Sequence, residues 1–333
     1  MQRSHYMLLC CAFQIKIIFM SRKLALKNWL KQIYKNNIKI KPASNDASFR
    51  QYYRTIIDNE NYIIMDAPPP QENIMPFLNV GKTLFDDGLN TPKIYHFDKK
   101  LGFIVMADLG DDLYLSLLPQ KADILYKDAI RSLVLMQNCA INNLAKYDEK
   151  LLLSEMELFI DWYLQRHLKL KLSSSQLKII NETFSILTGN ALEQPQVFTH
   201  RDYHSRNLLK TKINNPGIID FQDAVCGAHS YDLVSLLKDC YVSYSRPQII
   251  KWVEYFLKLK NSKIEIDDFV LNFDLMGMQR HLKAIGIFAR LNYRDNKPDY
   301  LKDIPRTLNY IKETSKTYPQ LKDFYNLLDD LKI

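Results

Sequence analysis

The stretch His200-Arg201-Asp202-Tyr203-His204-Ser205-Arg206-Asn207 decides how this sequence is interpreted. It places a carboxylate at Asp202 and an amide at Asn207. A second carboxylate, Asp220, follows thirteen residues after Asn207, directly behind the apolar run Gly217-Ile218-Ile219. The pattern predicts a strand, a loop and a second strand, with three oxygen-bearing side chains on adjacent elements.

This spacing, H-R-D followed by four residues and Asn, is that of a kinase catalytic loop. Phosphoryl transfer needs a carboxylate that orients and deprotonates the acceptor hydroxyl, which is the role predicted for Asp202. It also needs hard oxygen ligands that hold Mg²⁺ against the phosphates, a role predicted for Asn207 and Asp220. The alternative is a loop with a satisfied histidine and an ion pair, and two correctly spaced parts make it the weaker interpretation.

Outward from the loop, the sequence predicts an α+β protein of two lobes. An amphipathic helix over Ser21–Asn37 puts Leu26, Trp29 and Leu30 on one face. A helix is expected over Glu72–Phe85, and strands are expected over Phe49–Ile57, Tyr62–Met65, Lys93–His96 and Phe103–Met106. After a hinge near residues 107–111, helices are expected over Asp123–Leu144, Leu151–Leu170, Gln176–Leu192, Tyr231–Tyr244, Pro247–Leu259 and Phe269–Leu291. We therefore expect an N-lobe over residues 21–110 and a C-lobe over residues 111–333.

The charge of the chain is concentrated at one end. The 333 residues carry a net charge of +8, from 45 Lys and Arg against 37 Asp and Glu. Residues 1–44 hold nine basic residues and no acidic one, so the remainder has 36 against 37 and a net charge of −1. This balance disfavours a generally polyanion-binding protein. The ladder Lys23, Lys27, Lys31 and Lys35 either meets an anionic surface or is the solvated face of a packed helix.

The first twenty residues are expected to be an upstream extension or a disordered tail, with Met20 as the working start. The apolar run Met7–Phe13 is interrupted by polar residues, so it is too short for a transmembrane helix, and no signal-peptide cleavage site follows. We expect a cytoplasmic protein.

Several motifs resemble the aminoglycoside phosphotransferase/choline kinase superfamily, relatives of protein kinases. The catalytic loop and Ile219-Asp220-Phe221-Gln222-Asp223 carry this resemblance. Within the superfamily, the sequence is similar to the anomeric kinases of N-acetylmuramate and N-acetylglucosamine from residue 21 onward. The stretches that carry this similarity are Asp46–Arg50, Met65–Pro69, Asp108–Asp111, Tyr231–Leu237, Gln279–Lys283 and Gly286–Leu291. The resemblance implies a bilobal protein-kinase-like fold.

It also implies roles for residues that bind the nucleotide. The Ser44–Arg50 loop would cover the ATP phosphates, with backbone N–H groups from Ala47 and Ser48. A hinge of Met106, Ala107, Asp108 and Leu109 would read the adenine edge. His200 would support the catalytic loop, and Asp232 would brace it by accepting backbone N–H groups, unless Asp232 is a simple helix N-cap.

One departure from protein kinases concerns the phosphate-gripping lysine. Where a kinase strand would place it, this sequence has Ile63-Ile64-Met65-Asp66. Arg50 and Arg54, on the preceding strand, are the candidate replacements, because a guanidinium can bind phosphate oxygens in pairs. The alternative is that both are surface arginines.

Residues predicted to contact the acceptor are Asp161, Trp162, His204, Arg206 and Asp223. By resemblance, the helix of Asp161 and Trp162 borders the substrate cleft, although an ordinary amphipathic helix would look the same. His204 and Arg206 could touch the acceptor or an acidic lactyl carboxylate, or could structure the loop. Asp223 would steer substrate or cap a turn.

The expected function is an ATP- and Mg²⁺-dependent kinase that phosphorylates the anomeric hydroxyl of N-acetylmuramate or N-acetylglucosamine in cell-wall sugar salvage. One alternative is a kinase of the same fold acting on an aminoglycoside, choline or another sugar. Another is a nucleotide-binding module without catalysis, suggested by the missing lysine. We expect a monomer, with no nucleic-acid partner and no stable membrane association.

Overall fold

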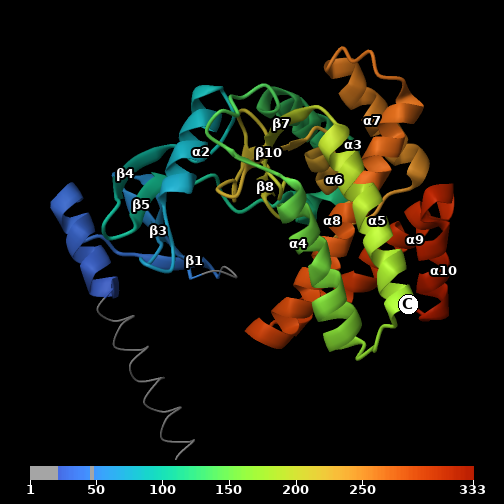
Figure 1. Cartoon of the computed structure of the whole chain (residues 1–333). Helices are drawn as coiled ribbons and strands as arrows, with labels where there is room; N and C mark the ends of the chain where they lie inside the picture. Colours follow the sequence, from blue (N-terminus) through green and yellow to red (C-terminus); the bar gives the residue numbers. More distant parts are fainter. Residues whose placement is uncertain (1–21, 46–48) are drawn as a thin grey trace, which may run out of the picture. The chain divides into compact units, whose positions relative to one another are not determined.

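A computed structural model describes residues 22–45 and 49–333, which form two compact units. The sheet unit contains the described residues up to Asn79 together with Pro92–Leu109. The helical unit contains Val80–Thr91 and Gly110–Ile333. Figure 1 shows the strands of the first unit and the helices of the second.

The sheet unit is built on five antiparallel strands in the order β1-β2-β3-β5-β4. Four of them overlap the predicted strands, whereas β1 was not predicted. Its sequence, Lys-Pro-Ala-Ser-Asn, is polar and contains a proline, which suits an edge strand that pairs on one side only. The strands are β1 (Lys41–Asn45), β2 (Gln51–Ile57), β3 (Glu60–Asp66), β4 (Ile94–Asp98) and β5 (Phe103–Ala107).

The helix at residues 22–34, blue in Figure 1, packs on this sheet through its predicted apolar face. Leu26, Trp29 and Leu30 are buried against residues of β2, β3 and β5, and the Trp29 and Phe103 rings lie 5.5 Å apart between centroids. The lysine ladder (Lys23, Lys27, Lys31 and Lys35) is exposed to solvent. The helix is thus explained by burial of its apolar face.

The helical unit takes most of its core from one long central helix, α8 (Ile266–Asp295), which packs against most of the others. The helices around it are α3 (Tyr114–Met136), α4 (Glu149–Leu158), η1 (Phe159–His167), α5 (Ser174–Glu193), α6 (Tyr231–Leu237), α7 (Arg246–Leu259), η2 (Pro298–Asp303), α9 (Ile304–Thr317), η3 (Pro319–Leu321) and α10 (Lys322–Asp330). Helix α2 (Met75–Asp86) runs from one unit into the other.

Short strands complete the helical unit and frame the catalytic loop. They are β6 (Ala145–Lys146), β7 (Gln196–Thr199), β8 (Leu208–Leu209), β9 (Gly217–Ile218) and β10 (Val225–Ala228). The loop follows β7 directly, and β8 pairs with β9, which ends two residues before Asp220. The predicted strand-loop-strand arrangement is confirmed.

Three of the predicted helices differ from the structure. Helix α3 runs from Tyr114 to Met136, not from Asp123 to Leu144, because it continues across a kink at Lys121 and a turn follows at residues 137–138. The expected helix over Leu151–Leu170 is an α-helix followed by the π-helix η1. Helix α6 ends at Leu237, because Asp239 just beyond it turns to accept the backbone N–H of Ser205.

The α-to-π transition coincides with a close approach of two backbones. A Cβ atom added to Gly286, on α8, would lie 2.4 Å from the carbonyl carbon of Leu158, the last residue of α4. Only glycine permits this distance. The contact brings α8 against the end of α4, and both helices contribute side chains to the candidate site.

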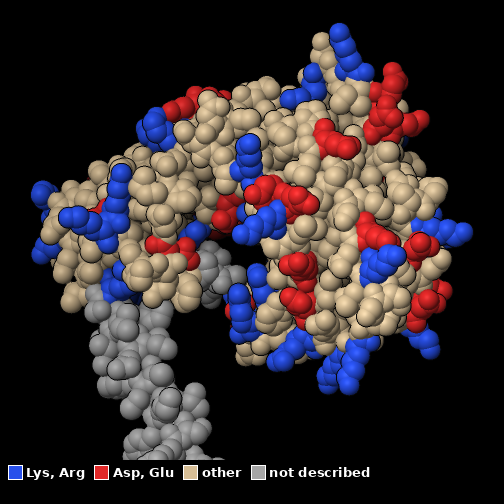
Figure 2. Space-filling model, viewed as in Figure 1, with Lys and Arg blue, Asp and Glu red and all other residues tan. Residues whose placement is uncertain are grey.

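Charges of both signs are interspersed on the face of the helical unit seen in Figure 2. This agrees with the near-zero balance of the sequence beyond residue 44. Among the helices of the described residues, none combines the length and apolar character needed to cross a membrane.

Candidate active site

The catalytic loop is a tight turn whose backbone folds back on itself. The His204 N–H donates to the Asp202 carbonyl at 3.0 Å, and the Asn207 N–H donates to the His204 carbonyl at 2.9 Å. The Asn207 side-chain nitrogen also donates to the Asp202 carbonyl, at 3.0 Å. Asp202, Arg206 and Asn207 are therefore held in one compact turn.

His200 and Asp232 connect this turn to neighbouring elements. The Asp232 carboxylate accepts the N–H groups of His200 at 2.7 Å and Arg201 at 3.0 Å. His200 Nε2 lies 3.1 Å from the Ile219 carbonyl, beside Asp220, and its Nδ1 accepts from the Asp202 N–H at 3.3 Å. Arg201 adopts a left-handed backbone conformation with φ of +74°, which this pair of hydrogen bonds to Asp232 supports.

Asp232 is buried inside α6, and its own charge state follows from its surroundings. Burial raises the pKa of Asp232 to about 6, although His200 and the two N–H donors favour the ionised form. The carboxylate is consequently ionised at neutral pH.

Asp202 sits in a cationic environment. Burial alone would raise the pKa of Asp202, but the charges of Lys283 and then of His204 and Arg280 lower it to about 2. Burial and the neighbouring Arg280 lower the pKa of His204 to about 4, against the pull of Asp239 and Asp202. At neutral pH Asp202 is thus a carboxylate and His204 a neutral imidazole.

Behind the loop, a buried ion network centres on Glu155 of α4. Its carboxylate accepts from Arg201, from the Tyr147 hydroxyl and from Lys283, whose Nζ lies 3.1 Å away. Burial opposes ionisation of Glu155, but Lys283 and Arg201 lower its pKa below the usual value. The network joins α4, the catalytic loop and α8 around one charge.

Asn207 and Asp220 lie side by side, with the Asn207 side-chain nitrogen 3.3 Å from Asp220 Oδ2. Gln222 donates to the other Asp220 oxygen at 2.9 Å. An amide oxygen and a carboxylate form a donor set suited to a hard divalent cation whose remaining ligands come from phosphates and water. In the described part of the chain, no cluster of three or more His, Cys, Asp and Glu residues could hold a metal by itself.

In the sheet unit, both candidate arginines contact carboxylates. Arg50 Nε donates to Glu72 at 3.0 Å in a pair whose side chains are 12% and 11% exposed, and Glu72 also accepts the Phe49 N–H at 3.3 Å. Arg54 donates to both carboxylate oxygens of Asp108. Neither is a plain surface arginine: Glu72 holds the end of the predicted phosphate-covering loop, and Arg54 ties β2 to the predicted hinge.

The other predicted nucleotide contacts come from the Ser44–Arg50 segment and from the end of β5. Ala47 and Ser48 lie outside the described residues. Met106 is buried within β5, and the Ala107 N–H donates to the Lys93 carbonyl at 2.8 Å. The N–H of Ala107 thus donates within the sheet unit, and the adenine contact of this residue stays a prediction.

The predicted acceptor residues lie in three places: on η1, in the catalytic turn and just after Asp220. Asp161 is exposed on η1 and Trp162 packs against the helical core, so the helix predicted at these two residues is a π-helix. His204 and Arg206 both contact the Tyr241 ring, at 5.5 Å between ring centroids and 3.8 Å from Cζ to the centroid. Asp223 is exposed and accepts from Gln222 at 3.1 Å, one residue away.

Sequence reasoning missed the groups that support the loop from a distance. Glu155, Asp239 and Tyr241 gave no motif signal, since each is a single polar or aromatic residue in an ordinary segment. Arg280 and Lys283 lie in the stretch Gln279–Lys283, which the sequence singled out only by resemblance. The structure buries both, leaving 6% and 8% of each residue exposed.

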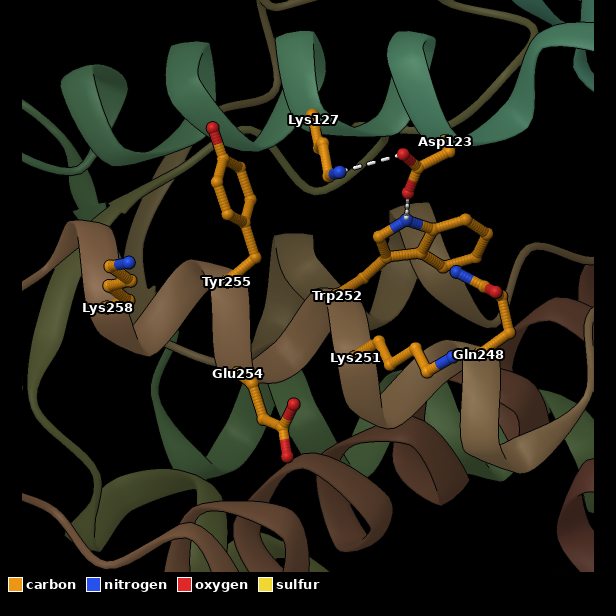
Figure 3. A pocket seen from close by; sticks show the side chains of 8 residues that line it. All are labelled: Asp123, Lys127, Gln248, Lys251, Trp252, Glu254, Tyr255 and Lys258. Atoms are coloured by element: carbon orange, nitrogen blue, oxygen red, sulfur yellow. Dashed lines mark hydrogen bonds and ion pairs between the residues drawn. The ribbon is translucent and has the colours of Figure 1, made fainter.

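A hollow elsewhere in the helical unit contains none of these residues. It has a volume of about 370 Å³, and Figure 3 shows its lining by side chains of α3 and α7, including Asp123, Lys127 and Trp252. Asp123 accepts from the Trp252 indole at 3.0 Å and from Lys127 at 2.7 Å. Asp123 is thus already paired, and no residue of the catalytic turn lines this hollow.

Comparison with known proteins agrees with the geometry of the loop. Residues 39–261 match the model of the phosphotransferase enzyme family. The chain is 42% identical over 297 residues to the N-acetylmuramate/N-acetylglucosamine kinase of Pseudomonas aeruginosa, covering 87% of this chain and 88% of that protein. It is 39% identical over 325 residues to the protein of the same name from Neisseria meningitidis, covering 94% and 96%.

Solved structures with the same fold are more distant in sequence. A choline kinase from Streptococcus pneumoniae superposes with a TM-score of 0.64 at 12% identity, covering 87% of this chain and 99% of that one. An ADP-bound aminoglycoside phosphotransferase superposes with a TM-score of 0.58 at 16% identity, covering 86% and 97%. The predicted bilobal, protein-kinase-like fold class is confirmed. The chain is an ATP-using kinase, and it belongs to the phosphotransferase enzyme family.

Proposed function

We propose that this kinase transfers the γ-phosphoryl group of ATP to the anomeric C1 hydroxyl of N-acetylmuramate and N-acetylglucosamine. The observation that carries the proposal is 39–42% identity, over most of the chain, to kinases named for these two sugars. The catalytic turn supports it, because Asp202, Asn207 and Asp220 are close together in one unit. Because ATP is a cytoplasmic metabolite, we place the reaction in the cytoplasm.

Asp202 is the proposed base. Its ionised carboxylate accepts the proton of the sugar hydroxyl as the bond from oxygen to phosphorus forms. His200 and Asp232 are positioning residues, since they fix the backbone of the turn through hydrogen bonds on both sides of Arg201. The network around Glu155 holds Lys283 near Asp202 and keeps the base charged.

Asn207 and Asp220 are the proposed ligands of Mg²⁺. When bound, the metal neutralises charge that develops on the transferring phosphoryl group. The side-chain nitrogen of Asn207 donates to the Asp202 carbonyl and lies 3.3 Å from Asp220 Oδ2, and its amide oxygen is the atom that would bind the metal. Gln222 fixes the Asp220 carboxylate from the opposite side.

For the nucleotide, we propose that the Ser44–Arg50 segment, including Ala47 and Ser48, covers the phosphates. The Arg50–Glu72 pair is a counterpart of the lysine–glutamate pair that positions phosphates in protein kinases. Arg54 supports the hinge by binding Asp108, and Met106 and Leu109 remain predicted adenine contacts.

The test is product analysis by phosphorus NMR after incubation with ATP, Mg²⁺ and each sugar. We expect a sugar 1-phosphate and ADP from the wild-type protein. Asp202→Asn removes the proton acceptor at nearly constant shape, so turnover should fall by about 100- to 10,000-fold with an unchanged circular dichroism spectrum. Phosphate found at another hydroxyl, or wild-type turnover in Asp202→Asn, would refute the corresponding part of the proposal.

A further inference from the structure

We propose that Arg206 binds a carboxylate of the acceptor, so that this enzyme distinguishes an acidic N-acetylated sugar from a neutral one. The inference rests on the proposed function and assigns a specificity-determining residue to it. N-acetylmuramate differs from N-acetylglucosamine by a lactyl ether that ends in a carboxylate. The question is which group in the helical unit can recognise that additional charge.

Arg206 is held in place by aromatic rings. Its Cζ lies 3.8 Å from the centroid of the Tyr241 ring and 5.5 Å from that of Tyr300. At 3.8 Å a planar guanidinium lies against the ring face in a cation–π contact. This contact uses the face of the group and leaves its N–H donors, which lie in its plane, directed outward.

The rings are themselves fixed to the catalytic turn and to α8. The Tyr241 N–H donates to Asp239 at 2.9 Å, and the second oxygen of Asp239 accepts the Ser205 N–H at 3.0 Å. Tyr300, on η2, stacks on Phe288 of α8 with 5.8 Å between centroids. Asp239 thus couples Tyr241 to the residue next to Arg206, so ring and guanidinium keep their relative position.

Among the residues that the structure describes, the guanidinium of Arg206 has no anionic partner. Across residues 22–45 and 49–333, no carboxylate or carbonyl oxygen accepts a hydrogen bond from its side chain, and only its backbone N–H donates, to His204 at 3.3 Å. Arg201, five residues earlier in the same turn, is by contrast paired with Glu155. Arg206 is half-buried, and Tyr241 and Tyr300 are half-buried beside it. It is therefore an oriented and accessible cation without an assigned ligand.

Its place in the turn gives this cation access to the acceptor. Arg206 adjoins Asn207, whose side chain donates to the Asp202 carbonyl. His204 contacts both neighbours of this surface: its N–H donates to the Asp202 carbonyl at 3.0 Å, and its ring lies 5.5 Å from the Tyr241 ring between centroids. A substrate whose hydroxyl reaches Asp202 extends beside this surface. Arg201 is already paired with Glu155, which leaves Arg206 as the positive side chain of the turn that no carboxylate of the described residues neutralises. A planar fork binds a carboxylate through two parallel hydrogen bonds.

The experiment compares kcat/KM for three acceptors: N-acetylmuramate, its methyl ester and N-acetylglucosamine. The ester keeps the lactyl group and removes its charge. In Arg206→Gln we expect the ratio of kcat/KM for the acid to that for the ester to fall by about 10- to 100-fold, because KM for the acid rises. Arg206→Lys keeps the charge but not the planar fork, so its acid-to-ester ratio should lie between those of the wild type and Arg206→Gln. Arg131→Gln, an exposed arginine of α3 paired with Asp128, is the matched control and should leave the ratio unchanged.

Each other outcome has a distinct meaning. If the acid-to-ester ratio is unchanged in Arg206→Gln while the wild type phosphorylates both sugars, the inference is wrong and the proposed function stands. An equal loss with all three acceptors, together with a raised KM for ATP, would overturn the inference and assign Arg206 to the nucleotide. A wild-type protein that phosphorylates neither sugar would overturn both.

Discussion

Glu155 offers a direct measure of how strongly the helical unit depends on its buried charges. In Glu155→Gln the side chain keeps its shape but loses the charge that Arg201 and Lys283 share. Removing one partner of a buried ion pair costs about 3–5 kcal/mol, because the remaining charge stays buried without compensation. For a unit of this size, 3 kcal/mol corresponds to a fall in Tm of about 6–12 °C. The assay is thermal unfolding followed by circular dichroism.

The control is Glu157→Gln, on the same helix two residues away. Glu157 is exposed, so its substitution should change the free energy of unfolding by no more than about 0.5 kcal/mol. If the two variants melt together, the network contributes nothing measurable and the reasoning is refuted.

The difference in Tm between the wild type and Glu155→Gln should also change with pH in a defined direction. Because the folded state lowers the pKa of Glu155 below its ordinary value of 4.5, the carboxylate stabilises the fold fully above pH 4.5. That stabilisation is lost as the pH falls through the folded-state pKa. The Tm difference between wild type and Glu155→Gln should therefore be constant above pH 5 and shrink in stronger acid. A difference that grows on acidification would contradict the assigned direction of the shift.

Three further predictions concern the metal, the helix contact and the strained residue. Asn207→Ala should raise the Mg²⁺ concentration needed for half-maximal activity by at least about tenfold, whereas Asn181→Ala, on the exposed face of α5, should not change it. Gly286→Ala should lower Tm because its Cβ would meet the facing backbone at 2.4 Å, while Gly189→Ala, with open space around it, should raise Tm slightly. Arg201→Gly should be more stable than Arg201→Ala by about 1 kcal/mol in urea unfolding, since φ is +74° and both variants lose the same ion pair; equal stabilities would contradict the strain.

Local patterns predicted the catalytic turn because its residues are adjacent in the chain. Asp202, Asn207 and Asp220 lie within twenty residues, and the hydrophobic strands on either side fix their approach. The apolar face of the helix at residues 22–34 was predictable for the same reason, since burial follows a period of 3.6. Such features can be predicted from the order of residues along a short segment alone.

The supporting contacts were not predictable because they join distant segments. Glu155 meets Arg201 and Lys283 across separations of 46 and 128 residues, and nothing local distinguishes it from the exposed Glu157. The strand β1 was missed because its polar sequence becomes a strand only through pairing with β2. Propensity cannot identify a partner that lies elsewhere in the chain.

The cationic surroundings of Asp202 constrain how it would work as the proposed base. A carboxylate with a pKa of about 2 has little affinity for a proton, so it cannot remove one from a sugar hydroxyl before transfer begins. In a loose transition state the phosphoryl group is largely detached from ADP before the new bond forms, and the hydroxyl becomes acidic only as it attacks phosphorus. The carboxylate then needs to orient the hydroxyl early and accept the proton late. Lys283 and Arg280 favour that order of events, because their charges lower the pKa of Asp202 and keep it ionised at neutral pH. The proposed base is therefore weak, but it is ionised at neutral pH and held in a fixed position.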